Sequence, residues 1–585
     1  MSGPNQRPEP RVNLRQVISD AFVLSNPYWQ SEERWRALAL LSAIIGLTLT
    51  LVAVTVATTY WQRGLFNSLE NRDASAFLAL LFAWYDDPEA GFVFGFAPLL
   101  AVHVICTTYA LYLKQALQIR WRTWLTAQMT DQYLSDQAYY AMQLGEEAVD
   151  NPDQRIAEDV RLFVDQTLTF GVGFLETFVS MASFLALLWA LSQEVSFWGV
   201  TVPGSLVWIA LAYAGLSTIF THVIGRRLVP LSFIQQRREA DYRFELMQLR
   251  ESSESVAFHR GEKTQAAVLR SLFNRLADNF RALMTVTKRV TFFYTSAAQG
   301  NLVFPLAVTA PAYFSGAIPL GGVFQTANAL NRVVENMSWF VSNYIELASY
   351  SAVVQRLSSF RKAVDDAHEQ LRTSLLIHSE GPHYALRDVE ISLPDGQSLL
   401  RCVNLELDPG SSLMIAGATG GGKSTLMRTL AGIWPYASGT LTRPSEGRVI
   451  FAPQKGYVPR GTLRQALVYP NQPLGHVTDD TLQQTLALVG LDHLSDHLGT
   501  SDNWARRLSG GEAQRLVWAR IFLQRPDFLF LDEVTSNLDA EWEEKLYSYL
   551  PQIQPKLTLV SVAHRPNLAR FHDRTVRVDN GRLRF

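Results

Sequence analysis

The sequence contains little cysteine, few charged residues and no excess of either charge. Its 585 residues include only two cysteines, which excludes a disulfide-stapled scaffold. The 52 Lys and Arg residues balance 54 Asp and Glu residues, so the basic excess that nucleic-acid binding requires is missing. Charged residues make up 18% of the chain, against about 25% in soluble proteins. We therefore expect a chain that combines a membrane part with a soluble part and binds no nucleic acid.

Long runs without charge fill the first part of the chain. Residues 37–60 contain no charged side chain, and such a run is long enough to cross about 30 Å of hydrocarbon. We expect it to be a membrane span, because it is too long for a signal peptide. Five further spans are predicted at 92–113, 172–191, 199–224, 291–315 and 320–345. The sequence thus predicts six spans.

The distribution of Lys and Arg predicts the orientation of these spans. Five arginines precede the first span, and the long segments 117–170 and 225–290 are rich in Lys and Arg, whereas 192–198 and 316–319 contain none. Cytoplasmic loops carry the positive charge, so both termini are expected in the cytoplasm.

An interfacial elbow helix is predicted before the first span, because four apolar residues fall there at helical spacing: Leu14, Val17, Ile18 and Phe22. The alternative is a surface helix of the soluble part.

The predicted sixth span differs from the others because polar side chains recur along it at three- and four-residue steps. Ionisable groups facing lipid are costly, so this stripe should face protein or water. One interpretation is hydrogen bonding to neighbouring helices. The interpretation that we favour is a polar translocation cavity. Its candidate lining residues are Glu176, near the start of the third span, together with Asn328, Arg332, Glu335 and Asn336.

From about residue 379 the pattern changes to short β-type runs, turns and soluble helices. An apolar run before residue 417 leads into a glycine-rich loop that is predicted to wrap its N–H groups around phosphates. The loop consists of Gly417, Ala418, Thr419, Gly420, Gly421, Gly422, Lys423, Ser424 and Thr425. Lys423 is predicted to reach the β- and γ-phosphates, and Ser424 to hold Mg²⁺.

Further motifs follow in an order that suits ATP hydrolysis. An apolar strand delivers Asp532 for the metal and Glu533 for the attacking water. Gln454 and His564 each follow a predicted strand and are candidates for contacting the metal or the γ-phosphate. A second anion site is predicted at a helix N-terminus. It consists of Ser509, Gly510, Gly511 and Glu512, with Asp539 in a later turn. One subunit does not need two anion sites, so this one is expected to serve a neighbouring chain.

This set of motifs resembles the ATP-binding cassette family over the whole chain. The resemblance implies a half-transporter with an α-helical six-span domain of the exporter type, forming a domain-swapped homodimer, followed by an α/β P-loop cassette. ATP and Mg²⁺ are the implied cofactors. The predicted divisions are a cytoplasmic segment with the elbow at 1–36, the transmembrane domain at 37–350, a linker at 351–378 and the nucleotide-binding domain at 379–585.

Three departures from the common cassette pattern narrow the resemblance. Glu512 replaces a glutamine, Asn537 replaces a small residue, and Leu393 stands where an aromatic side chain normally stacks on adenine. These features, with the blocks Asn151–Asp159 and Glu254–Glu262, resemble a branch that joins peroxisomal acyl-CoA carriers to bacterial SbmA/BacA-like proteins. We expect the two blocks to dock on the cassettes.

The resemblance implies import of bulky hydrophilic solutes, such as antimicrobial peptides, bleomycin-like glycopeptides or cobalamin, across a bacterial inner membrane. The final residues, 581–585, do not form a Ser-Lys-Leu peroxisomal address. Two alternatives stay open. One is an exporter of lipids, fatty acyl compounds or hydrophobic drugs, and the other is an ATPase sensor that transports nothing. The motifs do not fix the direction of transport.

Overall fold

The computed structural model describes residues 14–87, 91–145, 151–192, 203–470, 477–563 and 565–585. It contains two compact units. The described parts of Met1–Met129 and Asn151–Ser359 form the helical unit, and those of Thr130–Asp150 and Phe360–Phe585 form the cassette unit. The first long loop predicted from the sequence, 117–170, is therefore divided, because its described residues 130–145 group with the cassette unit.

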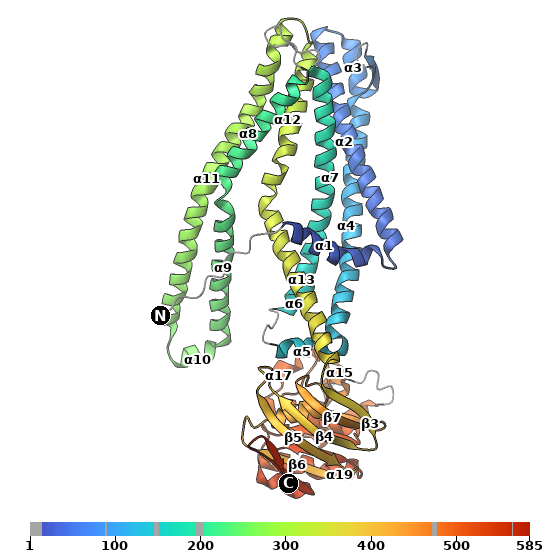
Figure 1. Cartoon of the computed structure of the whole chain (residues 1–585), viewed down its shortest axis with the longest axis vertical. Coiled ribbons are helices and arrows are strands. Elements are labelled where there is room, and N and C mark those ends of the chain that lie inside the picture. Colours follow the sequence, from blue (N-terminus) through green and yellow to red (C-terminus); the bar gives the residue numbers. More distant parts are fainter. Residues whose placement is uncertain (1–13, 88–90, 146–150, 193–202, 471–476, 564) are drawn as a thin grey trace. The chain divides into compact units, whose positions relative to one another are not determined.

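Long helices form the helical unit, and Figure 1 shows α9 and α11 as neighbours joined through α10. The elements that begin in this unit are α1 Leu14–Trp29, α2 Arg34–Glu70, α3 Ala74–Phe82, β1 Trp84–Asp87, β2 Gly91–Phe94, α4 Phe96–Leu134, α6 Pro152–Gln154, a π-helical turn Arg155–Asp159, α7 Val160–Leu191, α8 Ser205–Gly225, α9 Leu228–Glu251, α10 Ser253–Phe258, α11 Glu262–Phe314, α12 Leu320–Ser342 and α13 Tyr344–Arg372. Helix α12 packs against α2, α7, α8 and α11.

Four helical stretches among the described residues are long and apolar enough to cross a membrane. They are Arg34–Glu70, Phe96–Leu144, Pro152–Leu191 and Ser205–Glu251. They contain most of the first four predicted spans. The predicted second span starts too early, because Gly91–Phe94 is a β-strand paired with Trp84–Asp87 and the helix begins only at Phe96. The start of the predicted fourth span, up to residue 202, lies outside the described residues.

The fifth and sixth predicted spans fall in α11 and α12, which are not among these four stretches. Helix α12 carries the polar stripe, which lowers its mean hydropathy.

The predicted elbow forms α1, where Val17, Leu24 and Tyr28 are buried while Ile18 and Phe22 are exposed. A helix with one apolar face left exposed has the form that an interfacial location requires.

In its described residues, the cassette unit forms a six-stranded sheet, a four-stranded sheet and a short two-stranded ribbon of β9 and β10. Its remaining elements are a 3₁₀ turn Ser135–Gln137, α5 Ala138–Leu144, β3 Leu376–Gly381, β4 Tyr384–Ser392, β5 Ser398–Leu407, β6 Ser412–Gly417, α14 Lys423–Leu430, β7 Ala437–Pro444, β8 Val449–Ala452, β9 Gly461–Thr462, α15 Leu463–Val468, α16 Asp479–Leu488, a 3₁₀ helix Asp492–His497, β10 Ser501–Asp502, α17 Trp504–Arg507, α18 Gly510–Gln524, β11 Phe528–Asp532, α19 Ala540–Ile553, β12 Thr558–Val562, a 3₁₀ helix Pro566–Phe571, β13 Arg574–Asp579 and β14 Arg582–Arg584.

The larger sheet has the strand order β14-β13-β6-β12-β11-β8, and the smaller one has the order β3-β7-β4-β5. In the larger sheet β13, β6, β12, β11 and β8 run parallel to one another. The carboxyl ends of parallel strands meet at one edge, where ligands bind in open α/β sheets. This topology brings together the motifs that follow β6, β8 and β11.

The first of the two blocks that are expected to dock on the cassettes lies within the helical unit. Asn151–Asp159 forms α6 and the π-helical turn at the start of α7, within the helical unit. The part of the first loop that lies in the cassette unit is the preceding segment, where Leu144 at the end of α5 packs against the apolar core between the sheets. That the blocks Asn151–Asp159 and Glu254–Glu262 dock on the cassettes stays a prediction.

Candidate functional site

The phosphate loop connects β6 to α14, and its backbone requires glycine at both ends. Gly417 has φ 149° and Gly422 has φ 96°, values that side chains disfavour. A Cβ on Gly417 would also lie 2.7 Å from the carbonyl oxygen of Val578. Lys423 begins α14 and is 5% exposed. Its Nζ donates to the carbonyl oxygens of Gly417, at 3.0 Å, and Ala418, at 2.9 Å. The loop therefore holds the amino group of Lys423 against its own carbonyl oxygens.

The acidic end of β11 lies beside this loop. Ser424 Oγ donates to Asp532 Oδ1 at 3.1 Å, and Gln454 Nε2 donates to Glu533 Oε2 at 2.9 Å. Burial raises the pKa of Asp532 above its ordinary value, and the hydrogen bond from Ser424 partly opposes this rise. Glu533 has φ 50°, in the left-handed region, and its N–H donates to Val562. Such backbone strain in a non-glycine residue is typical of functional sites.

Four of the predicted catalytic and metal residues are thus neighbours: Ser424, Gln454, Asp532 and Glu533. His564 lies outside the described residues. Among the described residues no group of three or more His, Cys, Asp or Glu side chains is placed to hold a metal ion. The hydroxyl, amide and carboxylate groups of this cluster are nevertheless the hard oxygen donors that suit Mg²⁺.

The predicted second anion site forms a separate group in the cassette. Ser509 caps α18, and its side chain forms a reciprocal capping box with Glu512. Glu512 Oε2 accepts from the Ser509 N–H at 2.9 Å and from its hydroxyl at 2.8 Å. These bonds lower the pKa of Glu512, so its carboxylate stays charged. His493 Nε2 lies 3.1 Å from Glu512 Oε1.

The turn that carries Asp539 is held by residues that the sequence analysis missed. Asp539 caps α19 by accepting from the Trp542 N–H at 2.8 Å. Gln514, which is 4% exposed, donates to Ser536 Oγ at 3.0 Å and accepts from the Asn537 N–H at 2.9 Å. The sequence did contain a sign of this role, because Gln514 stands among the apolar residues of α18 and a buried amide needs hydrogen-bond partners.

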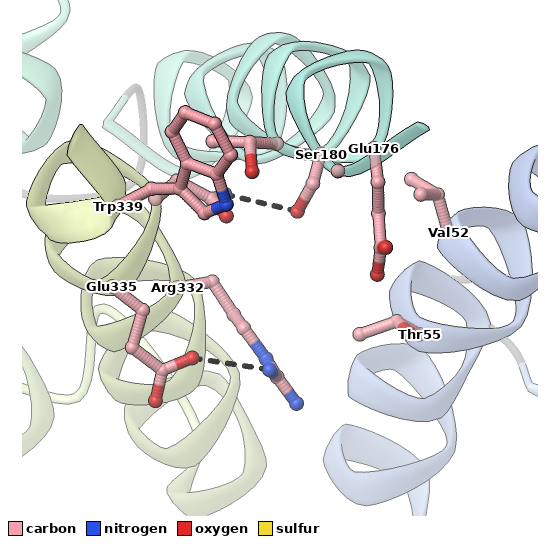
Figure 2. A pocket seen from close by; sticks show the side chains of 10 residues that line it. Val52, Thr55, Glu176, Ser180, Arg332, Glu335 and Trp339 are labelled. Atoms are coloured by element: carbon pink, nitrogen blue, oxygen red, sulfur yellow. Dashed lines mark hydrogen bonds and ion pairs between the residues drawn. The ribbon is translucent and has the colours of Figure 1, made fainter. Parts of the chain in front are cut away.

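The helical unit contains a polar pocket of about 280 Å³ between α2, α7 and α12 (Figure 2). Ten residues line it: Val52, Thr55, Gly173, Glu176, Thr177, Ser180, Arg332, Glu335, Asn336 and Trp339. Arg332 Nη1 pairs with Glu335 Oε2 at 3.1 Å, and Asn336 Nδ2 donates to Ser180 Oγ at 2.9 Å. Glu176 and Arg332 point into the space between the helices (Figure 2).

Four of the five predicted cavity residues therefore line one pocket, and Asn328 does not belong to its lining. Asn328 Nδ2 instead donates to Gln62 Oε1 on α2 at 2.7 Å. The sequence analysis missed Thr55 and Ser180, because single hydroxyls within apolar helices give no periodic signal. It missed Trp339, which follows the spacing of the stripe on α12, because only polar side chains were counted there. The lining thus contains two acidic side chains and one basic side chain.

Apolar helices long enough to cross a membrane, joined in one chain to a cassette with a phosphate loop, define half of an ATP-driven membrane transporter. Residues 24–314 match the family described as ABC transporter transmembrane region 2, and residues 400–536 match the ABC transporter family. The chain belongs to the ABC transporter family. It is an ABC half-transporter whose cassette hydrolyses ATP to drive transport.

Several known proteins resemble the chain over nearly its full length. An uncharacterized ABC transporter ATP-binding protein of Haemophilus influenzae is 33% identical, over 96% of this chain and 92% of that protein. ABC transporter D family member 2, chloroplastic, of Arabidopsis thaliana is 30% identical over 98% of this chain and 88% of that protein. The inner membrane ABC transporter ATP-binding protein YddA of Escherichia coli is 30% identical, over 95% of this chain and 97% of that protein.

The fold matches a solved structure of a bacterial Atm1-family ABC exporter with ATP bound. The TM-score is 0.67, with 16% sequence identity and 95% of each chain covered. This confirms the predicted exporter-type fold with a helical transmembrane domain followed by a nucleotide-binding cassette.

Proposed function

We propose that the chain is a homodimeric importer of bulky hydrophilic solutes in a bacterial inner membrane. The observation that carries this proposal is the polar pocket, where Glu176, Arg332, Glu335 and Asn336 gather between apolar helices. Charged groups in membrane helices are costly and mark solute pathways. A hydrocarbon chain in this pocket would offer these groups no hydrogen bonds beyond the ones that Arg332 forms with Glu335 and Asn336 forms with Ser180. Peptides, glycopeptides and cobalamin carry many groups able to satisfy them.

In the cassette, Lys423 binds the β- and γ-phosphates, and the N–H groups of the loop surround them. Ser424, Asp532 and Gln454 would hold Mg²⁺, which neutralises phosphate charge when bound. Glu533 orients the attacking water, and His564 contacts the γ-phosphate. Ser509, Gly510 and Gly511 of one subunit close on the ATP of the other, with Asp539 fixing the adjoining turn.

A second candidate function is the translocation of lipids or fatty acyl compounds. It is favoured by the resemblance of the sequence to the branch that contains the peroxisomal acyl-CoA carriers. ABC transporter D family member 2 of Arabidopsis thaliana is among the proteins similar to this chain. Solute-stimulated ATPase activity separates the candidates. Stimulation by peptides or cobalamin supports the import proposal, and stimulation by acyl chains alone contradicts it.

The pocket offers a matched pair of variants for testing uptake. Asn336→Ala removes a lining amide, whereas Asn328→Ala removes the same amide from the same helix outside the lining. We expect the uptake of labelled cobalamin or a labelled proline-rich peptide, in cells lacking their own routes, to fall about tenfold for Asn336→Ala and to change little for Asn328→Ala. Equal effects of the two variants, or no uptake by the wild type, would contradict the proposed route.

A further inference from the structure

Helix α18 of the cassette carries an anion of the chain itself at its N-terminus. Glu512, in the first turn of α18, accepts hydrogen bonds from both the N–H and the hydroxyl of Ser509. The same hydroxyl accepts from the Glu512 N–H at 3.3 Å. A helix N-terminus attracts negative charge, and here a carboxylate of the chain itself occupies the donors of Ser509.

This arrangement competes with the role proposed for Ser509. The Ser509 hydroxyl has a single proton to donate, and in this structure it donates that proton to Glu512. If the γ-phosphate of the partner's ATP is to receive it, Glu512 must give it up. The carboxylate then remains close to a phosphate of like charge, which weakens nucleotide-driven closure.

His493 is placed to moderate this charge. It lies on the 3₁₀ helix Asp492–His497, and its Nε2 is 3.1 Å from the Glu512 carboxylate. Arg515, one turn along α18, also attracts Glu512, but its guanidinium donates to the Gly490 carbonyl at 3.0 Å and stacks on Trp542 at 5.2 Å. His493 is therefore the side chain that holds the far oxygen of Glu512.

We propose that Glu512 is a positioning residue that sets the ATP requirement of the transporter, and that His493 acts through it. Glu512 holds the Ser509 hydroxyl until ATP arrives, so that closure of the cassettes requires a high ATP concentration. His493 draws the carboxylate toward itself and lowers this requirement. The inference rests on the proposed function, in that Ser509 is taken to meet the ATP of the partner subunit.

The test is steady-state ATPase kinetics of the full-length protein in lipid. Glu512→Gln keeps an acceptor for the Ser509 N–H but loses the charge, and we expect its KM for ATP to fall about five- to tenfold with kcat unchanged within about twofold. Glu512→Asp keeps the charge, so its KM should not fall below that of the wild type. A KM that is unchanged or raised in Glu512→Gln would overturn the proposal, since a simple helix cap predicts that result.

His493 provides an independent arm should Glu512→Gln fail to fold. We expect His493→Gln to raise the KM for ATP about threefold in the wild-type background and to have no effect in the Glu512→Gln background. An equal effect in both backgrounds, or none in either, would contradict the proposed coupling. Ser509→Ala distinguishes a failure of the proposed function from a failure of the proposal on Glu512. If this variant leaves kcat/KM unchanged, the proposed closure on the partner's ATP is wrong. If kcat/KM falls strongly, that closure stands and the other variants test only the role of Glu512.

Discussion

The Ser424 hydroxyl donates to a carboxylate, Asp532, whose charge is poorly solvated. Burial raises the pKa of Asp532, which means that the folded protein without nucleotide holds this charge at a cost. The same feature suits a metal ligand, because a divalent cation would relieve the cost on binding. At the residue scale, the cassette exchanges some stability for a site ready to receive Mg²⁺ and ATP.

Asp532→Asn should therefore stabilise the nucleotide-free protein while abolishing Mg²⁺-dependent hydrolysis. An acid whose folded pKa is raised destabilises the fold above that pKa, and the penalty disappears as the pH falls below the ordinary value of about 3.9. We expect the unfolding temperature of the variant to exceed that of the wild type by about 1–3 °C at pH 7. The difference should shrink as the pH is lowered. A lower unfolding temperature at pH 7 would contradict this account.

At the scale of elements, α7 and α13 are joined by a buried ion cluster. Asp159 is 1% exposed and accepts from Arg356 Nε at 2.8 Å and Nη2 at 2.6 Å. Arg155, one turn earlier in the π-helical turn, donates to it at 2.8 Å. Removing a buried charge that has two partners leaves both arginines unpaired, so this cluster fixes the start of α7 against α13.

Asp159→Asn should lower the stability of the protein by about 2–3 kcal/mol. A lower unfolding temperature and a lower yield of folded protein would report the loss. Asp365→Asn is the matched control, because its pair with Arg361 is exposed and 3.9 Å long, and it should change stability by less than about 0.5 kcal/mol. Equal effects of the two variants would show that burial of Asp159 is not decisive.

The amide of Gln514 joins α18 to the turn before α19. Gln514→Ala removes its hydrogen bonds to Ser536 and Asn537, leaving this turn less well positioned. We expect kcat for ATP hydrolysis to fall about tenfold and stability to fall by about 1–2 kcal/mol. Gln552→Ala, an exposed glutamine on α19, should leave both unchanged. An unchanged kcat in Gln514→Ala would contradict a positioning role.

The sequence predicted the elements far better than the contacts between them. Hydrophobic runs and glycine spacing predict the spans and the phosphate loop, since both depend on local chemistry. Two contacts could not be predicted in this way, because each joins residues about twenty positions apart that lie on different elements. They are the contact of Gln514 with Asn537 and the contact of Glu512 with His493. Asn328 illustrates the limit: helical periodicity put it with Arg332, but which neighbouring helix meets each turn depends on packing.

At the scale of the whole molecule, the chain joins an ATP-hydrolysing cassette to helices that enclose a polar pocket. The cassette brings Ser424, Asp532 and Glu533 together for hydrolysis, and in the proposed function the pocket receives a polar solute. What makes the two parts a transporter is that hydrolysis in one moves solute through the other, since closure and reset of the cassettes bias two states of the membrane part.

The most direct test of this claim is to measure ATP hydrolysis and solute movement in the same proteoliposomes, with cassettes facing the medium and labelled cobalamin or peptide inside. Glu533→Gln is compared with the wild type, and Glu541→Gln, which changes an exposed acid in the first turn of α19, is the control. We expect Glu533→Gln to lose hydrolysis at least about 100-fold and to lose solute movement with it, while the control retains both. Solute movement that persists in Glu533→Gln, or hydrolysis at the wild-type rate, would contradict the account.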